Sequence, residues 1–304
     1  MAKTKTLTVP WNDRAGRFSP LKAAVLAGLT VPALILITQF ATGALGASGP
    51  LGPLGPRPIT ELIHGTGDWT IRFLFLSLAV TPLRRIADWP KLILVRRMIG
   101  LAALFYGLAH LTLYTVDQNF KLFHVASEIV LRFYLTIGFV ALLGLCVLGA
   151  TSTDAAIRKL GGNWGRLHKI VYAIGILAAL HFFMQTKADV YQATLMSGLF
   201  VLLMIYRLLH WRGFDITSPL TLAAAAVLAG LTTAGLEYAW YGLATGIPPS
   251  RVLAANLHFS FSVRPAWWVL AVGVGAAAVP LLRPLLGESR GPKGGRRAAR
   301  APAG

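Results

Sequence analysis

The chain has 304 residues, of which 55% are hydrophobic and only 13% are charged, and its mean hydropathy is +0.63. A soluble domain carries about twice that fraction of charge, so the composition excludes an ordinary soluble domain. It predicts a membrane protein built from helices, whose backbone polar groups are satisfied internally. The formal net charge of +18 fits Lys and Arg of cytoplasmic loops held at the lipid bilayer, so we expect no nucleic-acid partner.

Eight apolar runs follow one another along the chain, each long enough for a membrane-spanning helix. The predicted spans are residues 22–44, 68–84, 97–115, 129–150, 167–186, 190–209, 219–243 and 266–286. Small residues after the first run resemble a signal-peptidase site. The run is too long for the apolar part of a signal peptide, so we expect an uncleaved first helix.

Positive charges cluster on every second loop of this pattern. The clustered residues are Lys3, Lys5, Arg14, Arg17 and Lys22; Arg84, Arg85, Lys91, Arg96 and Arg97; Arg158, Lys159 and Arg166; Arg207 and Arg212; and Arg283, Arg290, Lys293, Arg296, Arg297 and Arg300. The loops between them carry few basic residues. Because Lys and Arg accumulate in cytoplasmic loops, this alternation predicts an even number of spans, with the N- and C-termini in the cytoplasm.

The composition changes along the chain and suggests four parts. Residues 1–21 form a basic N-terminal segment, and 22–210 contain six spans with most of the histidines. Residues 211–286 contain two spans that are rich in Ala, Gly and Leu and lack histidine within them. Residues 287–304 form a basic, Gly- and Pro-rich tail that we expect to be disordered. The predicted fold is an all-α polytopic membrane helix bundle, with a six-helix core and two further C-terminal helices.

Two histidines inside the predicted spans indicate a cofactor. His110 and His181 lie at similar heights, toward the outer ends of two spans that run in the same direction. Haem b takes two axial imidazoles and suits an apolar bundle, whereas zinc requires three or four ligands. The single Cys146 provides no disulfide framework and no CxxC motif. A hydrogen bond between helices is the alternative role for either histidine.

A second haem at the inner side is a further hypothesis. His168 precedes His181 by 13 residues, a rise of roughly 20 Å on a helix, although a straight helix would turn the two side chains about 140° apart. The position that would pair with it on the third span is Arg96, which can neutralise haem propionates or lie near a second iron. His64 is either a residue at the haem edge or partner surface, or part of a helix start. We expect the remaining histidines, His124, His210 and His258, to be interfacial or loop residues.

Three segments resemble one known family. Residues 57–85 ("RPITELIHGTGDWTIRFLFLSLAVTPLRR"), 96–114 ("RRMIGLAALFYGLAHLTLY") and 164–182 ("WGRLHKIVYAIGILAALHF") closely resemble the MsrQ (YedZ) family of the ferric reductase-like transmembrane group. The resemblance extends over about residues 20–210. It implies that the six-helix core is ferric reductase-like and lies in the bacterial inner membrane.

The resemblance also implies a function. Members of the family bind haem b and pass electrons outward to a periplasmic molybdenum-cofactor subunit that reduces methionine sulfoxide in oxidised envelope proteins. The donor would be a flavin reduced by a cytosolic flavin reductase, or quinol, so FMN and quinone are further candidate ligands. The histidines that correspond to the family's haem-associated residues are His110, His168 and His181. The last two spans have no counterpart with an assigned role, and no nucleotide-binding motif is attached.

Two other functions remain open at this stage. The first is a stand-alone transmembrane haem b reductase, which reduces ferric iron or another acceptor at the outer face and needs a substrate site there. The second is a transporter or structural bundle without a cofactor, which would be colourless and would tolerate replacement of both histidines.

Overall fold

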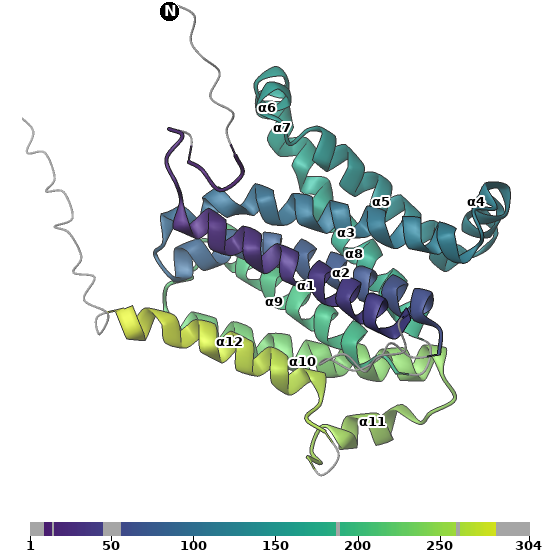
Figure 1. Ribbon diagram of the computed structural model, residues 1–304. Helices are drawn as coiled ribbons and strands as arrows, with labels where there is room; N and C mark the ends of the chain where they lie inside the picture. Colours follow the sequence, from purple (N-terminus) through teal and green to yellow (C-terminus); the bar gives the residue numbers. More distant parts are fainter. Residues whose placement is uncertain (1–8, 14, 45–55, 187–188, 260–261, 284–304) are drawn as a thin grey trace, which may run out of the picture.

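The computed structural model describes residues 9–13, 15–44, 56–186, 189–259 and 262–283, and these residues form a bundle of helices (Figure 1). The α-helices are α1 (Pro20–Ala44), α2 (Pro58–Ile86), α3 (Arg96–Asp117), α4 (Leu122–Leu131), α5 (Phe133–Ala150), α6 (Asp154–Leu160), α7 (Gly162–Leu167), α8 (Val171–Thr186), α9 (Tyr191–Trp211), α10 (Pro219–Ala244), α11 (Pro249–Ala255) and α12 (Pro265–Leu282). Two 3₁₀ segments, η1 (Pro90–Val95) and η2 (His168–Ile170), precede α3 and α8. The predicted tail, 287–304, lies outside the described residues.

Seven helical segments within the described ranges are long and apolar enough to cross a membrane. They are Pro20–Gly43, Pro90–Asp117, Phe133–Ala150, Gly162–Thr186, Tyr191–Trp211, Pro219–Ala244 and Pro265–Leu282. The remaining predicted span, 68–84, lies within α2, which has 29 residues. Charged residues along α2, including Asp68 and Arg72, distinguish it from those seven.

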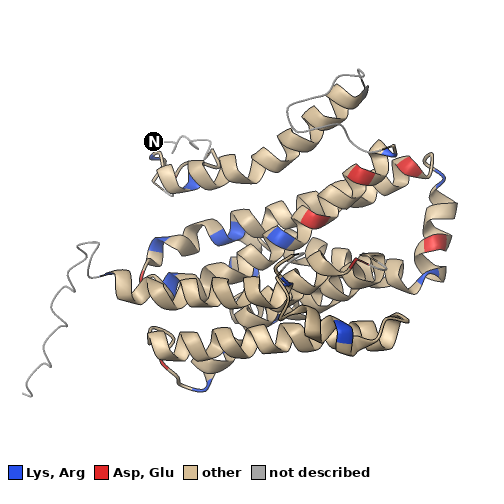
Figure 2. Cartoon of the chain, turned by 90° about the horizontal axis from the view of Figure 1, so that it is seen from below, with Lys and Arg blue, Asp and Glu red and all other residues tan. Residues whose placement is uncertain are grey.

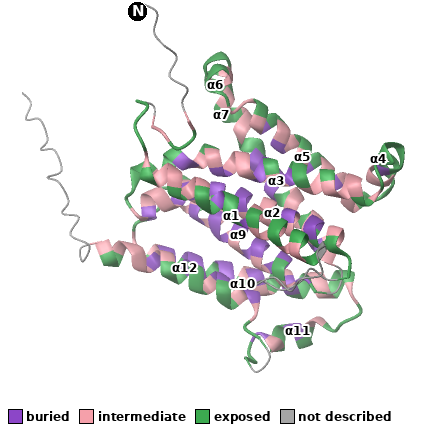
Figure 3. Cartoon of the chain, viewed as in Figure 1, coloured by how far each residue is buried: buried purple, intermediate pink, exposed green. Residues whose placement is uncertain are grey.

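The outer surface of the bundle is apolar. Large hydrophobic side chains such as Phe105, Leu220 and Leu231 are exposed on the helix surfaces, and Figure 3 shows exposed residues along the outer faces of the long helices. In water such a surface would be unfavourable, whereas in a bilayer it contacts lipid. The chain is therefore an all-α, multi-pass membrane protein, as the composition predicts.

Two predicted spans differ from the observed helices in a way that matters for the site. The predicted helix 129–150 is interrupted at Arg132, whose backbone is extended (φ −103°, ψ 105°). The residues before this break form the short helix α4. The predicted helix 167–186 begins with the 3₁₀ turn η2 at His168, so His168 and His181 do not lie on one straight α-helix.

Helix α2 lies at the centre of the bundle. Its buried side chains are Leu62, Ile63, Thr66, Ile71, Phe73, Leu74, Phe75, Ser77, Leu78, Val80, Pro82 and Ile86. Those from Ile71 to Ile86, apart from Ser77 and Pro82, belong to the main hydrophobic core, together with residues of α3, α5, α8 and α9. Charged residues within α2, such as Glu61, Asp68 and Arg72, would be costly in contact with lipid, which explains why other helices surround this one.

Several helix ends meet on one side of the bundle. The Arg283 guanidinium, just after α12, donates a hydrogen bond to the Arg85 carbonyl at the end of α2 (2.9 Å). At the end of α9, Arg207 donates to the Leu78 carbonyl (2.6 Å). Arg97, at the start of α3, forms an ion pair with Asp154, which follows α5. We call this end of the bundle the basic end. In Figure 2, most charged residues lie toward the helix ends, and uncharged residues fill the lengths between them.

The C-terminal helices α10 and α12 pack closely on α9 at one flank of the bundle (Figure 1). A Cβ atom added at Gly273 would lie 2.5 Å from Ala226 Cβ, and one added at Gly198 would lie 2.3 Å from Thr233 Oγ1. Small residues at such contacts let membrane helices approach each other closely. Arg264, just before α12, forms an ion pair with Glu237 of α10, whose side chain is only 1% exposed. This hairpin is thus fixed by close packing and by a buried charge pair.

Candidate functional site

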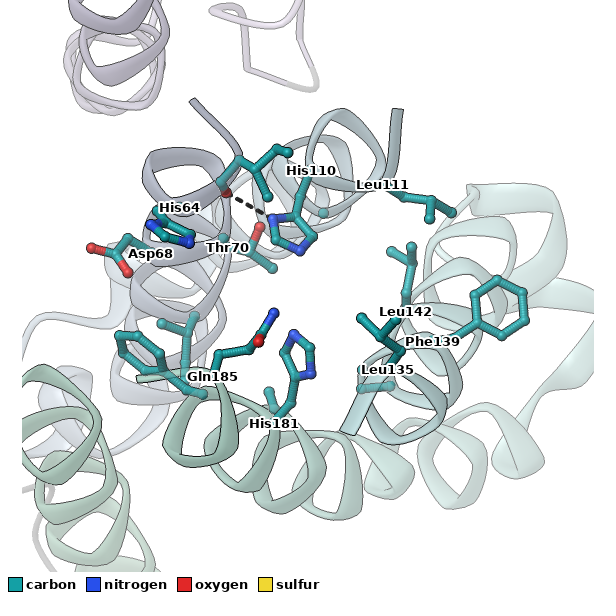
Figure 4. Close-up of a pocket in the computed structure, with 18 of the residues that line it drawn as sticks. His64, Asp68, Thr70, His110, Leu111, Leu135, Phe139, Leu142, His181 and Gln185 are labelled. Atoms are coloured by element: carbon teal, nitrogen blue, oxygen red, sulfur yellow. Dashed lines mark hydrogen bonds between the residues drawn. The ribbon is translucent and has the colours of Figure 1, made fainter. Parts of the chain in front are cut away.

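A cavity of about 510 Å³ lies at the end of the bundle opposite the basic end. Helices α2, α3, α5 and α8 provide most of its wall, and α4 adds Ile129. The wall is mainly apolar, and it includes the histidines His64, His110 and His181 (Figure 4). Its volume lies within the range of about 300–1,000 Å³ that small-molecule and cofactor sites occupy.

His110 is positioned by helix α2. Its Nδ1 lies 2.8 Å from the carbonyl oxygen of Ile63. Gly67, one turn after Ile63, faces the same imidazole: a Cβ added at Gly67 would lie 3.0 Å from His110 Nδ1. Because a carbonyl oxygen can only accept, the bond requires the proton on Nδ1. The lone pair of the neutral ring is then on Nε2.

His181 is held in the same way by helix α5. Its Nδ1 lies 2.8 Å from the carbonyl oxygen of Tyr134. A Cβ added at Gly138, one turn after Tyr134, would lie 2.7 Å from His181 Nδ1. In both cases the carbonyl residue precedes the histidine by 47 positions. The α2–α3 pair and the α5–α8 pair therefore repeat one arrangement of carbonyl, glycine and histidine.

The two imidazoles face each other across the cavity. Their ring centroids are 6.3 Å apart, and the ring planes are at 88°. In Figure 4, the nitrogen of each ring that is not bonded to a carbonyl is directed toward the space between the rings. Two metal–nitrogen bonds of about 2 Å, plus roughly 1.2 Å from each nitrogen to its ring centre, would span about 6.4 Å. The pair can therefore bind one metal atom from two opposite sides.

The two-histidine donor set is small. Among the described residues, no group of three or more His, Cys, Asp or Glu side chains is close enough to hold a metal ion. Two imidazoles alone do not make the tetrahedral site that zinc requires, whereas two is the number of side-chain ligands that a haem iron can take. The structure brings His110 and His181 together, and their role as haem ligands stays a prediction.

Polar groups lie along one side of the cavity. His64 is exposed, and it lines the cavity next to Asp68, whose carboxylate is 3.2 Å from Arg72. Gln185 and Asp189 line it further along. His64 also lies in the second turn of α2, near the start of that helix. Its role at a haem edge or partner surface stays a prediction.

Comparisons with known proteins identify the family. Residues 66–179 match the family described as "Ferric reductase like transmembrane component". A relative from Xanthomonas campestris pv. campestris is 44% identical over 151 residues, which cover 49% of this chain and 69% of the relative. A relative from Azospira oryzae is 38% identical over 198 residues, 64% of this chain and 79% of the relative. Each is named "Protein-methionine-sulfoxide reductase heme-binding subunit MsrQ". The chain belongs to the MsrQ family. No solved structure matches it.

The third histidine that the MsrQ resemblance singled out, His168, lies apart from the cavity, at the basic end. Its Nε2 is 3.1 Å from the Thr151 hydroxyl, and its ring stacks on Trp164 with centroids 4.0 Å apart. Arg96 is within electrostatic range of His168, so the structure brings together the two residues predicted for the inner side. The other histidines lie outside the cavity and are exposed: His124 on α4, His210 near the end of α9, and His258 after α11.

Sequence reasoning missed the two glycines that face the imidazoles. The glycines on the histidine-bearing helices themselves are Gly100, Gly107 and Gly175. Gly107 does line the cavity, but a Cβ at Gly175 would meet Phe200 of α9 at 2.8 Å, so that glycine serves helix packing. The relevant glycines are on the opposite helices. Gly67 and Gly138 each precede their histidine by 43 residues, and this equal spacing is the signal in the sequence that could have found them.

We predict that Gly138→Ala displaces the His181 imidazole. The new methyl group would overlap the ring, and overpacking of this kind costs about 1–3 kcal/mol. Gly144→Ala is a control for overpacking on the same helix pair, since its Cβ would lie 2.8 Å from the Ile174 side chain and touch no imidazole. We expect the haem Soret band of the purified protein to weaken or shift in Gly138→Ala and to change little in Gly144→Ala. Equal spectra for the two variants would contradict this role of Gly138.

Proposed function

We propose that this chain is the haem b-binding membrane subunit of a protein-methionine-sulfoxide reductase, with His110 and His181 as axial ligands. The observation that supports this most directly is the pair of imidazoles 6.3 Å apart. The family name adds the substrate class, because the MsrQ relatives are named as subunits of such a reductase.

The residues around the cavity fit a haem. Both imidazoles are fixed by carbonyls in the tautomer that leaves Nε2 available to iron. Hydrogen bonding of the other ring nitrogen also makes an imidazole a more basic ligand and fixes its orientation. The apolar wall, with Leu111, Leu142 and Phe139, excludes water and suits a macrocycle. When bound, the haem iron would accept and release one electron at a time.

The charge distribution supports an orientation in the bacterial inner membrane. Because basic residues favour the cytoplasm, we place the basic end and the two termini inside and the cavity in the outer half. Electrons would then arrive near His168 and Arg96. The donor we propose is a cytosolic reduced flavin, supplied by a flavin reductase, or the quinone pool. FMN or quinone would bind at this inner side, and His168 with Arg96 is also where a second haem would have to lie.

The proposed acceptor is a soluble periplasmic subunit with a molybdenum cofactor. Reduction of one methionine sulfoxide to methionine consumes two electrons and two protons and releases one water. This chemistry would take place on the partner, and the membrane chain supplies electrons. We assign this role to a ferric reductase-like core at 22–210, with 211–286 as a two-helix extension, 1–21 as the N-terminal segment and 287–304 as the tail.

Reoxidation of the reduced protein tests this proposal. We expect the protein, purified in detergent with haem available, to show a reduced-minus-oxidised haem b spectrum after dithionite treatment. Removing excess dithionite and adding the molybdenum subunit with a protein that contains methionine sulfoxide should then reoxidise the haem. Omitting either addition is the control. A haem protein that is reoxidised by ferric citrate but not by the partner and sulfoxide would instead be a stand-alone reductase.

A further inference from the structure

Three arginines from three helices converge at the basic end. Arg84 is near the end of α2, Arg96 begins α3, and Arg207 is near the end of α9. All three side chains are partly buried. Arg96 interacts electrostatically with both of the others, and those interactions are repulsive. We call these residues the arginine cluster.

The described part of the chain provides no carboxylate for this cluster. The described ion pairs join other residues: Arg17 to Asp13, Arg72 to Asp68, Arg97 to Asp154, Arg132 to Glu128, and Arg264 to Glu237. Asp215, after α9, accepts hydrogen bonds from Thr217. Partly buried like charges without a counter-ion repel one another, and this repulsion is screened less than it would be in bulk water. A bound anion would remove this cost.

The cluster also has unused hydrogen-bond donors. Arg84 Nε is buried without a partner among the described residues, as is the hydroxyl of Thr81, one turn earlier on α2. Arg207, by contrast, is fixed in place: its Nε donates to the Tyr172 hydroxyl (3.2 Å) and its guanidinium donates to the Leu78 carbonyl (2.6 Å). Arg207 is thus held in position by its own hydrogen bonds, and Arg84 has an N–H donor that is available to a ligand.

We propose that the arginine cluster is a binding site for a phosphate group. Guanidinium groups bind phosphate through paired, charge-assisted hydrogen bonds, and this geometry favours phosphate over monovalent halide. The cluster lies near the ends of the long helices α2, α3 and α9, at the basic end that we place at the cytoplasmic headgroups. Basic pockets between helices at this depth bind acidic phospholipids. The phosphate can belong to such a headgroup or to a small soluble phosphate compound.

The test is binding to the full-length protein in detergent, with phosphatidylglycerol, phosphatidylcholine and inorganic phosphate as probes. Native mass spectrometry counts bound lipid, and thermal unfolding reports stabilisation by each probe. Arg96→Gln removes one member of the cluster. Arg97→Gln is the matched control, because it removes the same charge at the next position but from an exposed pair with Asp154. Arg84→Gln serves as a second variant if Arg96→Gln does not fold.

We expect phosphatidylglycerol to bind more tightly than phosphatidylcholine, and Arg96→Gln to weaken that binding by about fivefold, which corresponds to about 1 kcal/mol for one arginine near a membrane surface. Arg97→Gln should change it by less than about twofold, as expected for an exposed charge pair. Stabilisation by inorganic phosphate alone, lost in Arg96→Gln, would support the site and identify a soluble source.

Two results would overturn the proposal. One is binding of both lipids with no dependence on Arg96 and no effect of phosphate. The other is a pyridine haemochrome count that falls from two haems to one in Arg96→Gln, because the guanidinium groups would then neutralise the propionates of a second haem. The outer histidine pair is not altered in any of these variants, so failure here leaves the proposed haem function unaffected.

Discussion

Replacing either cavity histidine should abolish haem binding at the outer site. His110→Ala and His181→Ala each remove one of the two nitrogen donors that face each other. Loss of a group that only orients a metal ligand costs about 10–100-fold in affinity, so loss of the ligand itself should exceed that. We expect the pyridine haemochrome assay to show that this haem is absent from both variants.

Matched variants separate ligand loss from general damage. His124→Ala and His210→Ala remove exposed histidines outside the cavity and should keep the full haem content. His168→Ala should keep the outer haem, because that residue is not part of the cavity wall. Addition of imidazole to His181→Gly should restore a haem spectrum, since the small molecule can occupy the space that the side chain leaves. Normal haem content in both His110→Ala and His181→Ala would refute the assignment.

The sequence predicted the helices well because hydropathy determines them. Seven of the eight predicted spans coincide with helices that can cross a membrane. The exception is α2, which begins ten residues before the predicted start. The prediction began too late because the first turns of α2 include polar residues such as Glu61 and His64. These turns line the cavity rather than lipid, and hydropathy does not distinguish a polar wall from a loop. The break at Arg132 was missed for the opposite reason, since apolar residues continue across it.

Only part of the candidate site could be predicted from the sequence. Height within the membrane placed His110 near His181, because loop charges fix the direction of each helix. The supporting carbonyls of Ile63 and Tyr134 could not be predicted, because a backbone acceptor has no residue-type signal. The arginine cluster was also missed, apart from Arg96. Helix rotation decides that Arg84 and Arg207 both lie close to Arg96, and the sequence does not specify how neighbouring membrane helices are rotated toward one another.

The buried charge pair Glu237–Arg264 should be the largest single electrostatic contribution to the stability of the α10–α12 hairpin. The Glu237 side chain is 1% exposed and that of Arg264 is 21% exposed. Glu237→Gln keeps the shape and leaves a partly buried cation without its partner, which costs about 3–5 kcal/mol. We expect unfolding in mixed detergent and SDS to show a loss of this size. Arg97→Gln, which breaks an exposed pair, should cost at most about 1 kcal/mol.

The double variant Glu237→Gln/Arg264→Gln decides whether the charges act as a pair. If they do, the second substitution removes the uncompensated cation, so the double variant should be more stable than Glu237→Gln alone.

The loss of the Glu237–Arg264 pair should also affect the cavity. Arg264 interacts electrostatically with Asp189, which lines the cavity, and the Tyr191 hydroxyl donates to the Val263 carbonyl (2.8 Å) next to it. We therefore expect Glu237→Gln to lose its Soret band at a lower temperature than the wild-type protein. Additive losses in the double variant, with an unchanged Soret transition, would show instead that the two side chains contribute independently and do not act as a pair.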